Sequence, residues 1–232
     1  VKQEVLAALD CGYKHIDCAA ATVTSRRWAL RHEDVFLTSK LWNTQHHRDY
    51  VETACRKSLI HLGLDYLDLY LMHWPMASQR GTELMPKRAD GSVCYDNIHY
   101  WETWVAMENL VDKGLVRAIG LSNFNGRQTD DVNTLAKHCG QPGMGLFVAV
   151  DVGVTAYSPL GSADQPRDSP DEPCLLQDPG LGAIANHHRK TPAQVILTWQ
   201  VQRGVVCIPK SVTPSRIQQN LQVFDFSFRM KT

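Results

Sequence analysis

The stretch Tyr66-Leu67-Asp68-Leu69-Tyr70-Leu71-Met72-His73-Trp74-Pro75 decides the fold class of this chain of 232 residues. Residues 66–72 alternate in hydrophobicity as a β-strand does, and the pattern stops at His73-Trp74-Pro75. A helical pattern precedes the strand over residues 49–62, and another follows it over residues 100–113. Because parallel strands need helices as crossovers, a strand between two such helices predicts a parallel α/β sheet.

The same order of strand, loop and helix continues along the chain on both sides of this stretch. Right-handed crossovers that repeat around a ring close a sheet into a barrel, so we predict an α/β barrel. The acidic, proline-containing residues 164–179 are interpreted as an active-site loop and not as a linker, so one domain over residues 1–232 is expected. The other predicted strands span residues 14–18, 35–39, 116–121, 154–158 and 205–208. Four other helices are predicted: one that ends near Leu9, one over residues 127–138, one over residues 192–203 and one that begins near Pro214.

Composition and charge exclude several classes of function. Lys plus Arg number 24, as do Asp plus Glu, so no overall field attracts nucleic acid or an anionic membrane surface. No apolar run approaches the roughly 20 residues that cross a bilayer, and the first residues resemble the inside of an amphipathic helix and not a signal peptide. The 7 cysteines are scattered, with no Cys-x-x-Cys pair. We therefore predict a cytoplasmic protein with reduced thiols and no nucleic-acid or membrane partner.

Three ionisable residues, Asp17, Lys40 and His73, each lie at or just beyond the carboxyl end of a predicted strand. In a parallel barrel these ends face one side, where catalytic groups collect. Any one of the three is more readily interpreted as a cap or a loop salt bridge. Their recurrence on three strands favours a catalytic cluster.

Five segments of the chain form a recognisable series. They are Gly12-Tyr13-Lys14-His15-Ile16-Asp17, Thr38-Ser39-Lys40-Leu41-Trp42-Asn43, residues 66–75, Gly120-Leu121-Ser122-Asn123-Phe124 and Ile208-Pro209-Lys210-Ser211. In this order they resemble successive motifs of the aldo-keto reductase superfamily, and within it those of the NADPH-dependent aldehyde reductases. The similarity extends over nearly the whole chain, and it implies a TIM (β/α)8 barrel.

The resemblance implies the reduction of a small-molecule aldehyde or ketone, in which NADPH gives hydride to the carbonyl carbon and a tyrosine gives the proton. It assigns the tuning of that phenol to Lys40, the electrostatic partner of the lysine to Asp17, and carbonyl orientation to His73. A lysine cation acidifies a phenol by stabilising phenolate. Trp42 and Trp74 would form the walls of the carbonyl pocket, although as isolated residues they would more often be packing.

The tyrosine itself does not stand where the resemblance expects it. Five residues after the aspartate the chain has Thr22, whose hydroxyl is too weak an acid to replace a tuned phenol. The interval from Asp17 to Lys40 is also too short for the expected crossover helix. The first barrel strand that the resemblance expects is not evident either. A later strand that bears a nicotinamide-binding glutamine is also not evident, since Gln141 lies in a Gly/Pro turn. We therefore expect an incomplete barrel that lacks a segment after Asp17.

A phosphate site is predicted without a Rossmann motif, because no Gly-x-Gly-x-x-Gly follows a strand. Residues 210–216 join a strand to a helix, with Thr213 as N-cap and Pro214 at the first position. Lys210, Arg216 and the helix N–H groups then surround one pocket. The alternative is an ordinary basic helix start.

The resemblance makes this pocket the 2′-phosphate site of NADPH. It further implies contacts of the adenine, the carboxamide, the nicotinamide ring and the pyrophosphate along the same edge of the barrel. The residues assigned to the cofactor are Lys210, Ser211, Val212 and Arg216 for the phosphate loop, Gln219 and Asn220 for the adenine, Ser122 and Asn123 for the carboxamide, Tyr157 for ring stacking, and Ser158, Leu160 and Ser162 for the pyrophosphate.

Three hypotheses remain open for the function of the chain. It is an active reductase, a non-catalytic NADPH-binding protein, or a chain that is incomplete as a folding unit, with open sheet edges. A metal is not expected, because the adjacent pairs His46-His47 and His187-His188 point apart and no further ligand completes a site. A monomer is expected.

Overall fold

The computed structural model of the chain describes residues 2–18, 31–135, 153–161 and 174–228. The chain divides into two compact units, one of Val1–Tyr13 with Gly153–Thr232 and one of Lys14–Val152. Within the described ranges, no helix combines the length and the apolar character that a membrane span requires.

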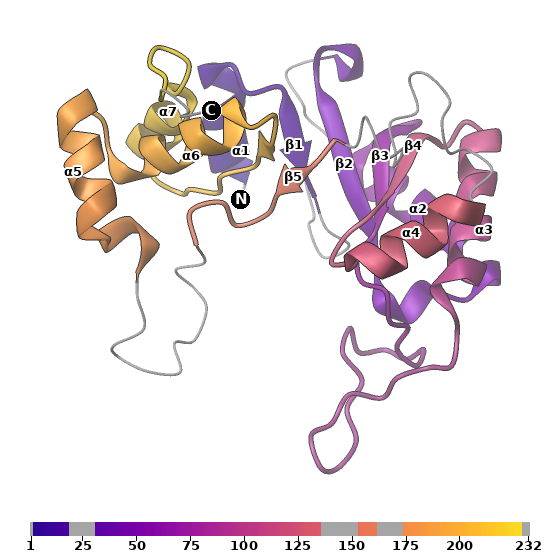
Figure 1. Ribbon diagram of the computed structural model, residues 1–232. Coiled ribbons are helices and arrows are strands. Elements are labelled where there is room, and N and C mark those ends of the chain that lie inside the picture. The colour runs from indigo at the N-terminus through magenta and orange to yellow at the C-terminus, as the bar shows by residue number, and fades with distance from the viewer. Residues whose placement is uncertain (1, 19–30, 136–152, 162–173, 229–232) are drawn as a thin grey trace. The chain divides into compact units, whose positions relative to one another are not determined.

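The unit of residues 14–152 is built on a four-stranded parallel sheet (Figure 1). Its strands stand in the order β1 (His15–Asp17), β2 (Phe36–Leu41), β3 (Leu67–Met72) and β4 (Val116–Leu121). The register pairs Asp17 with Thr38, Lys40 with Leu71 and Met72 with Leu121. The carboxyl ends of all four strands therefore meet at one edge, as the sequence analysis predicted.

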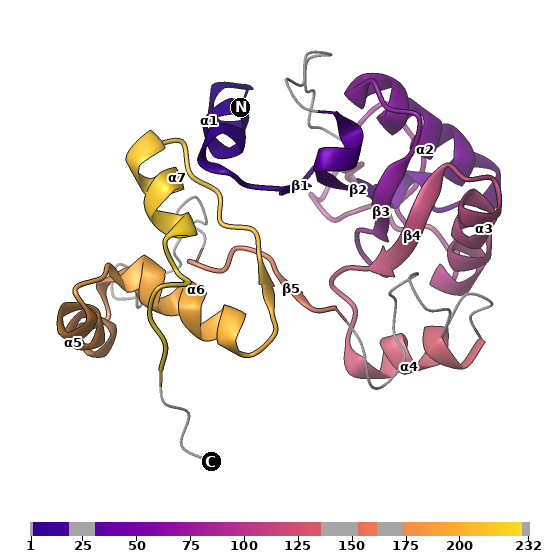
Figure 2. The same cartoon turned by 90° about the horizontal axis from the view of Figure 1, so that it is seen from above.

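Helices α2 (Arg48–Leu62) and α3 (Tyr100–Asp112) lie together on one face of this sheet (Figure 1 and Figure 2). Helix α2 begins after His47, whose ring accepts a hydrogen bond from the Asp49 N–H, and ends at Gly63, whose φ of 70° a Cβ would disfavour. Its buried residues recur at helical spacing and form one apolar stripe. They are Val51, Cys55, Leu59 and Leu62. The remaining helical segments of the unit are η1 (His32–Asp34), η2 (Asn43–Gln45) and α4 (Gly126–Leu135).

Asp68 ties the strands together near the opposite edge of the sheet. Its buried carboxylate accepts a hydrogen bond from the Leu37 N–H of β2 at 2.9 Å. It also bonds to His32 Nε2 at 3.2 Å and to the Arg117 guanidinium at 3.3 Å. A buried carboxylate is costly unless it is paired and hydrogen-bonded. These contacts therefore help to hold β2, β3 and β4 in register at the edge of the sheet opposite Asp17, Lys40 and His73.

The other unit combines helices with a two-stranded parallel sheet, in which β5 (Thr155–Ala156) pairs with β6 (Val206–Cys207). Its helix α6 begins with a capping box in which Thr191 and Gln194 satisfy each other's backbone N–H groups. The remaining elements of the unit are α1 (Lys2–Cys11), η3 (Leu175–Gln177), α5 (Pro179–His188), α6 (Pro192–Gln202) and α7 (Pro214–Leu221).

The predicted strands and helices are confirmed within one to three residues at their ends, and one helix was missed. Helix α5 begins at Pro179, the last residue of the predicted loop 164–179, of which residues 164–173 lie outside the described ranges. Its start has the sequence signal of a helix: Asp178 accepts from the Leu181 N–H at 2.8 Å, and Pro179 occupies the first position. Predicted helical residues after Leu135 lie outside the described ranges.

Helix α2 provides a test of the packing. Leu59 is 5% exposed, whereas its neighbour Ile60 is 63% exposed. Leu59→Ala should lower the free energy of unfolding by about 2–5 kcal/mol, because it leaves a cavity against the sheet. Ile60→Ala removes a side chain of similar size from an exposed position. It should change the free energy of unfolding by less than about 0.5 kcal/mol. Urea denaturation of both variants would measure the difference, and equal losses would contradict this packing.

Candidate active site

Asp17 and Lys40 form a close ion pair at the carboxyl edge of the four-stranded sheet. The Lys40 Nζ lies 2.5 Å from both carboxylate oxygens of Asp17 and 3.0 Å from the carbonyl oxygen of Cys18. Lys40 is 9% exposed. An ammonium has three N–H donors, and these three acceptors use all of them. The predicted pairing of the two side chains is thus observed.

His73 follows β3 at the same edge and lies in the field of this ion pair. Burial and then the Lys40 ammonium lower the pKa of His73 below its ordinary value, while the Asp17 carboxylate acts in the opposite direction. The imidazole is therefore neutral at pH 7. Its Nδ1 is buried and has no hydrogen-bond partner among the residues that the structure describes. A neutral imidazole can donate one hydrogen bond to a carbonyl oxygen without carrying charge into the site.

The two tryptophans predicted as pocket walls both lie against His73. The ring centroids of Trp42 and His73 are 5.1 Å apart and those of Trp74 and His73 are 6.3 Å apart. The indole Nε1 of Trp42 donates to the Leu84 carbonyl oxygen at 2.6 Å. This bond anchors the long loop after β3 to the edge of the site, a contact that the sequence did not indicate. Whether these indoles contact a substrate stays a prediction.

Ser122 and Asn123 lie at the end of β4, beside His73. Asn123 has a φ of 63°, in the left-handed region that asparagine tolerates better than most residues. This turn lets its Nδ2 donate to the His73 carbonyl oxygen at 2.9 Å and approach Ser122 Oγ at 3.3 Å. Asn123 therefore supports the backbone of His73 directly. Its predicted contact with a carboxamide stays a prediction.

The predicted phosphate residues lie around the start of α7 in the other unit. Thr213 is the N-cap residue, as predicted, but its side chain makes no capping hydrogen bond; instead its N–H donates to Ser211 Oγ at 3.1 Å. The first N–H groups of α7 are thus not capped by that side chain. Lys210 and Arg216 are exposed on either side of the helix start. This set of donors suits an anion.

The remaining predicted cofactor residues differ in their surroundings. Tyr157 is 72% exposed, directly after β5. Ser158 has a φ of 46°, and Leu160 is half-buried in the same turn. On α7, Gln219 is exposed and Asn220 is buried, and Val212 precedes the helix on the surface. Ser162, Thr22 and Gln141 lie outside the described residues.

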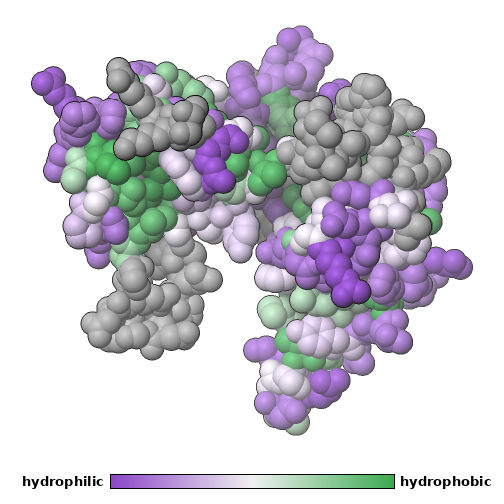
Figure 3. Space-filling view, viewed as in Figure 1, coloured by the Kyte–Doolittle hydropathy of each residue, from purple (hydrophilic) through white to green (hydrophobic). Residues whose placement is uncertain are grey.

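An open hollow beside α5 contains none of the predicted site residues. Hydrophobic surface lies over this part of its unit (Figure 3). The hollow is lined by Ala183, Ile184, His187, His188, Ser227 and Phe228. The hollow is therefore not where the sequence predicts the catalytic or cofactor-binding residues.

His46 is a titratable residue of the site region that the sequence analysis set aside. It is 1% exposed, and neither ring nitrogen has a partner among the described residues. Its carbonyl oxygen accepts from the Thr103 hydroxyl at 2.9 Å, which fixes the backbone after η2 against α3. Burial lowers the pKa of His46 from its ordinary 6.5 to about 4, so the ring is neutral at pH 7.

Known proteins match nearly the whole chain. The model of the "Aldo/keto reductase family" matches residues 1–231. "Aldo-keto reductase family 1 member A1-A" of Danio rerio is 56% identical over 252 residues, covering 97% of this chain and 78% of the relative. The Homo sapiens "Aldo-keto reductase family 1 member A1" is 49% identical over 261 residues, covering 98% of this chain and 78% of the relative.

A solved structure confirms the predicted fold class. The "Aldose Reductase from Schistosoma japonicum" superimposes with a TM-score of 0.83 at 40% sequence identity, covering 97% of this chain and 79% of that chain. At this identity and coverage, the TIM-barrel type predicted from the order of strands and helices is correct for this chain.

Titration of His46 predicts how stability depends on pH. The unfolded chain binds a proton near pH 6.5, whereas the folded chain binds it only near pH 4. Stability is therefore complete above pH 6.5 and is lost as the pH falls toward 4. Between pH 7.5 and pH 5, the free energy of unfolding of His46→Leu should therefore fall by about 2 kcal/mol less than that of the parent chain. Urea denaturation at both pH values measures the difference.

The exposed residue His61 of α2 supplies the control for this measurement. His61→Leu should keep the full pH dependence of the parent chain. If His46→Leu lost stability between pH 7.5 and 5 as steeply as His61→Leu, His46 would not be buried in its neutral form.

Proposed function

The chain belongs to the aldo/keto reductase family, and we propose that it binds NADPH and reduces a small aldehyde or ketone to an alcohol at a low rate. Reduction of carbonyl compounds is the activity of that family, to which the enzymes named above belong. The observation that carries the proposal is the cluster of Asp17, Lys40 and His73 on three adjacent strands.

The residues around the start of α7 fit a phosphate. Lys210 and Arg216 are exposed cations, and the first N–H groups of the helix carry the positive end of its dipole. An additional phosphate is what distinguishes NADPH from NADH, which is why this donor set supports the phosphorylated cofactor. When bound, the nicotinamide cofactor supplies the hydride.

The catalytic cluster would act on the carbonyl oxygen. The neutral imidazole of His73 donates a hydrogen bond that orients the carbonyl, and the positive charge of Lys40 stabilises the negative charge that develops on its oxygen. Asp17 keeps the Lys40 ammonium in place by accepting two of its hydrogen bonds. Trp42 and Trp74, which flank His73, would bound the substrate on its apolar side.

The final proton is the step for which the chain is poorly equipped. In the described part of the unit that holds Lys40, no tyrosine hydroxyl is bonded to its ammonium, whose three acceptors come from Asp17 and Cys18. Water would then supply the proton. Loss of a general acid commonly lowers the rate by about two to four orders of magnitude, which is the reason for the proposed low rate.

A second candidate is a protein that binds NADPH without turnover. It is favoured by the hydrogen bonds of Lys40, all three of which go to Asp17 and Cys18 and none to a tyrosine. It is also favoured by the length of the alignment with the Danio rerio relative. That alignment spans 252 positions against 232 residues of this chain, so the relative has internal residues for which this chain has no counterpart. This supports the interpretation that segments found in relatives are missing from this chain.

We also propose that the chain acts as a single cytoplasmic domain and as a monomer. The described cysteines, Cys11, Cys18, Cys55, Cys94, Cys174 and Cys207, are free thiols, which supports a reducing compartment. The single domain and the monomer rest on the sequence alone.

Turnover tests the two candidates directly. With a simple aromatic aldehyde, the protein should oxidise NADPH slowly, and Lys40→Met should reduce that rate at least about tenfold, because it removes the charge that stabilises the alkoxide. Lys57→Met, which removes an exposed lysine of α2, should leave the rate unchanged. The rate is followed by loss of NADPH absorbance. A folded protein that binds NADPH but shows no turnover would support the second candidate.

Cofactor affinity tests the phosphate site. Arg216→Ala should raise the Kd for NADPH about tenfold or more, since charge-assisted hydrogen bonds contribute roughly 1.5–3 kcal/mol, and should leave the Kd for NADH nearly unchanged. Arg203→Ala, which removes a guanidinium 4.3 Å from the Trp199 ring, is the control and should affect neither. Quenching of tryptophan fluorescence measures both constants, and equal effects of Arg216→Ala on NADPH and NADH would argue against the assignment.

A further inference from the structure

Helix α7 carries Arg216, Gln219 and Asn220 but has only 8 residues. Helices of this length are unstable in isolation, so the position of such a helix depends on the contacts that hold it. The start of α7 has no capping hydrogen bond from the side chain of Thr213. Its middle and its end, in contrast, are bonded to side chains from two other segments of the same unit.

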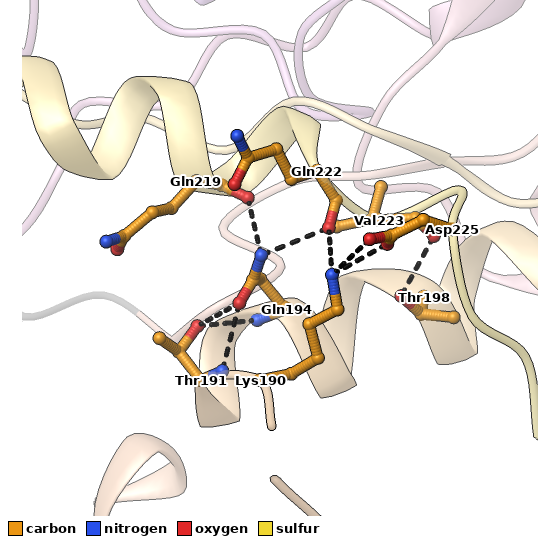
Figure 4. A network of polar contacts seen from close by, with 8 residues as sticks. All are labelled: Lys190, Thr191, Gln194, Thr198, Gln219, Gln222, Val223 and Asp225. Atoms are coloured by element: carbon orange, nitrogen blue, oxygen red, sulfur yellow. Dashed lines mark hydrogen bonds and ion pairs between the residues drawn. The ribbon is translucent and has the colours of Figure 1, made fainter. Parts of the chain in front are cut away.

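Gln194 of α6 holds the carboxyl end of α7 (Figure 4). Its Nε2 donates to the carbonyl oxygens of Gln219 at 3.1 Å and Gln222 at 3.0 Å. The last carbonyl groups of a helix have no full set of partners within the helix. Here the Gln219 carbonyl also accepts from the Gln222 N–H at 3.0 Å, and Gln194 adds a bond to it and one to the carbonyl of the C-cap residue Gln222. Gln194 is 5% exposed, so little water competes for these bonds.

The orientation of this amide is fixed from the other side. Gln194 Oε1 accepts from the Thr191 N–H at 2.9 Å and from the Thr191 hydroxyl at 3.2 Å. An amide has two donor and two acceptor positions, and all four are used. A flip of the amide would place its oxygen against the carbonyl groups of α7, so the capping box at the start of α6 also orients the end of α7.

Lys190 reinforces the same end of the helix (Figure 4). Its Nζ is 3.5 Å from the Gln222 carbonyl oxygen and 2.6 and 2.7 Å from the carboxylate oxygens of Asp225. A cation at this position complements the negative end of the helix dipole. The chain that follows α7 is thereby tied to the start of α6.

Tyr13, directly after α1, holds the middle of α7. Its hydroxyl donates to the carbonyl oxygen of Ile217 at 3.0 Å, one residue after Arg216. Burial raises the pKa of Tyr13 to about 12, so the phenol keeps the proton that it donates. Ile217 is itself buried. Hydrogen bonds from Tyr13 and from Gln194 therefore oppose sliding and rotation of α7 at two different points of the helix.

We propose that Gln194 and Tyr13 are positioning residues for the 2′-phosphate. They hold α7 so that Arg216 and the first N–H groups of the helix meet the phosphate together. The inference rests on the proposed NADPH binding. Charge-assisted hydrogen bonds depend strongly on geometry, so a small displacement of α7 weakens the phosphate contacts more than contacts with the rest of the dinucleotide.

The ratio of the Kd for NADH to the Kd for NADPH tests the proposal, measured by tryptophan fluorescence. Gln194→Met keeps the size of the buried side chain and removes both donors; it should lower this ratio about fivefold to tenfold. Tyr13→Phe removes one oxygen and should lower it about twofold to fivefold. A merely structural role would weaken the binding of both cofactors alike and leave the ratio unchanged.

Thr198→Val is the matched control. Thr198 also lies in α6, and its hydroxyl donates to the Val223 carbonyl oxygen at 3.1 Å, beyond the end of α7. This variant loses a hydrogen bond from the same helix to the same C-terminal segment, yet it should keep the ratio of the parent chain. A fall in the ratio as large as that of Gln194→Met would overturn the proposal.

The outcomes separate this inference from the proposed function. If the parent chain does not prefer NADPH to NADH, the phosphate site itself fails. If Arg216→Ala abolishes the preference but Gln194→Met and Tyr13→Phe retain it, the site stands and the positioning role is wrong. Should circular dichroism show that Gln194→Met is unfolded, Tyr13→Phe decides, because it removes a single hydroxyl.

Discussion

The ion pair between Lys40 and Asp17 is the interaction on which the candidate active site depends. Removing either charge from water is costly unless the partner is present with good geometry. That geometry exists only because β1 and β2 run parallel with Asp17 opposite Thr38, two residues before Lys40. The backbone ladder therefore creates the electrostatic site, and the Cys18 carbonyl oxygen completes it by accepting the third hydrogen bond of the ammonium.

The consequences of this pair extend to the next two strands. Its ammonium, together with burial, keeps His73 neutral, so the imidazole can donate a hydrogen bond but does not add a second positive charge. Asn123 then holds the His73 backbone from β4, in a left-handed conformation that few other residues adopt. Each strand thus supports the residue contributed by its neighbour.

The parts of this arrangement that follow local rules could be predicted from the sequence. The alternation in residues 66–72 identified β3 and placed His73 at its end, and parallel pairing then placed Asp17 and Lys40 beside it. Helix α5 was missed although Asp178-Pro179 is a regular start signal, because the acidic residues before it suggested a loop. Contacts such as Asn123 to the His73 carbonyl, or Gln194 to the end of α7, depend on tertiary distances that no spacing in the sequence encodes.

Cofactor recognition and proton transfer make different physical demands, and a chain can meet one without the other. Phosphate contacts of the kind proposed at α7 would stabilise a bound cofactor equally before and during reaction, so they would contribute affinity and not rate. A general acid acts only as charge develops on the carbonyl oxygen, so its loss lowers the rate and leaves binding intact. Because the proposed phosphate donors and the Asp17–Lys40 pair lie on separate elements with separate supporting contacts, an affinity for the proposed cofactor would be no measure of turnover.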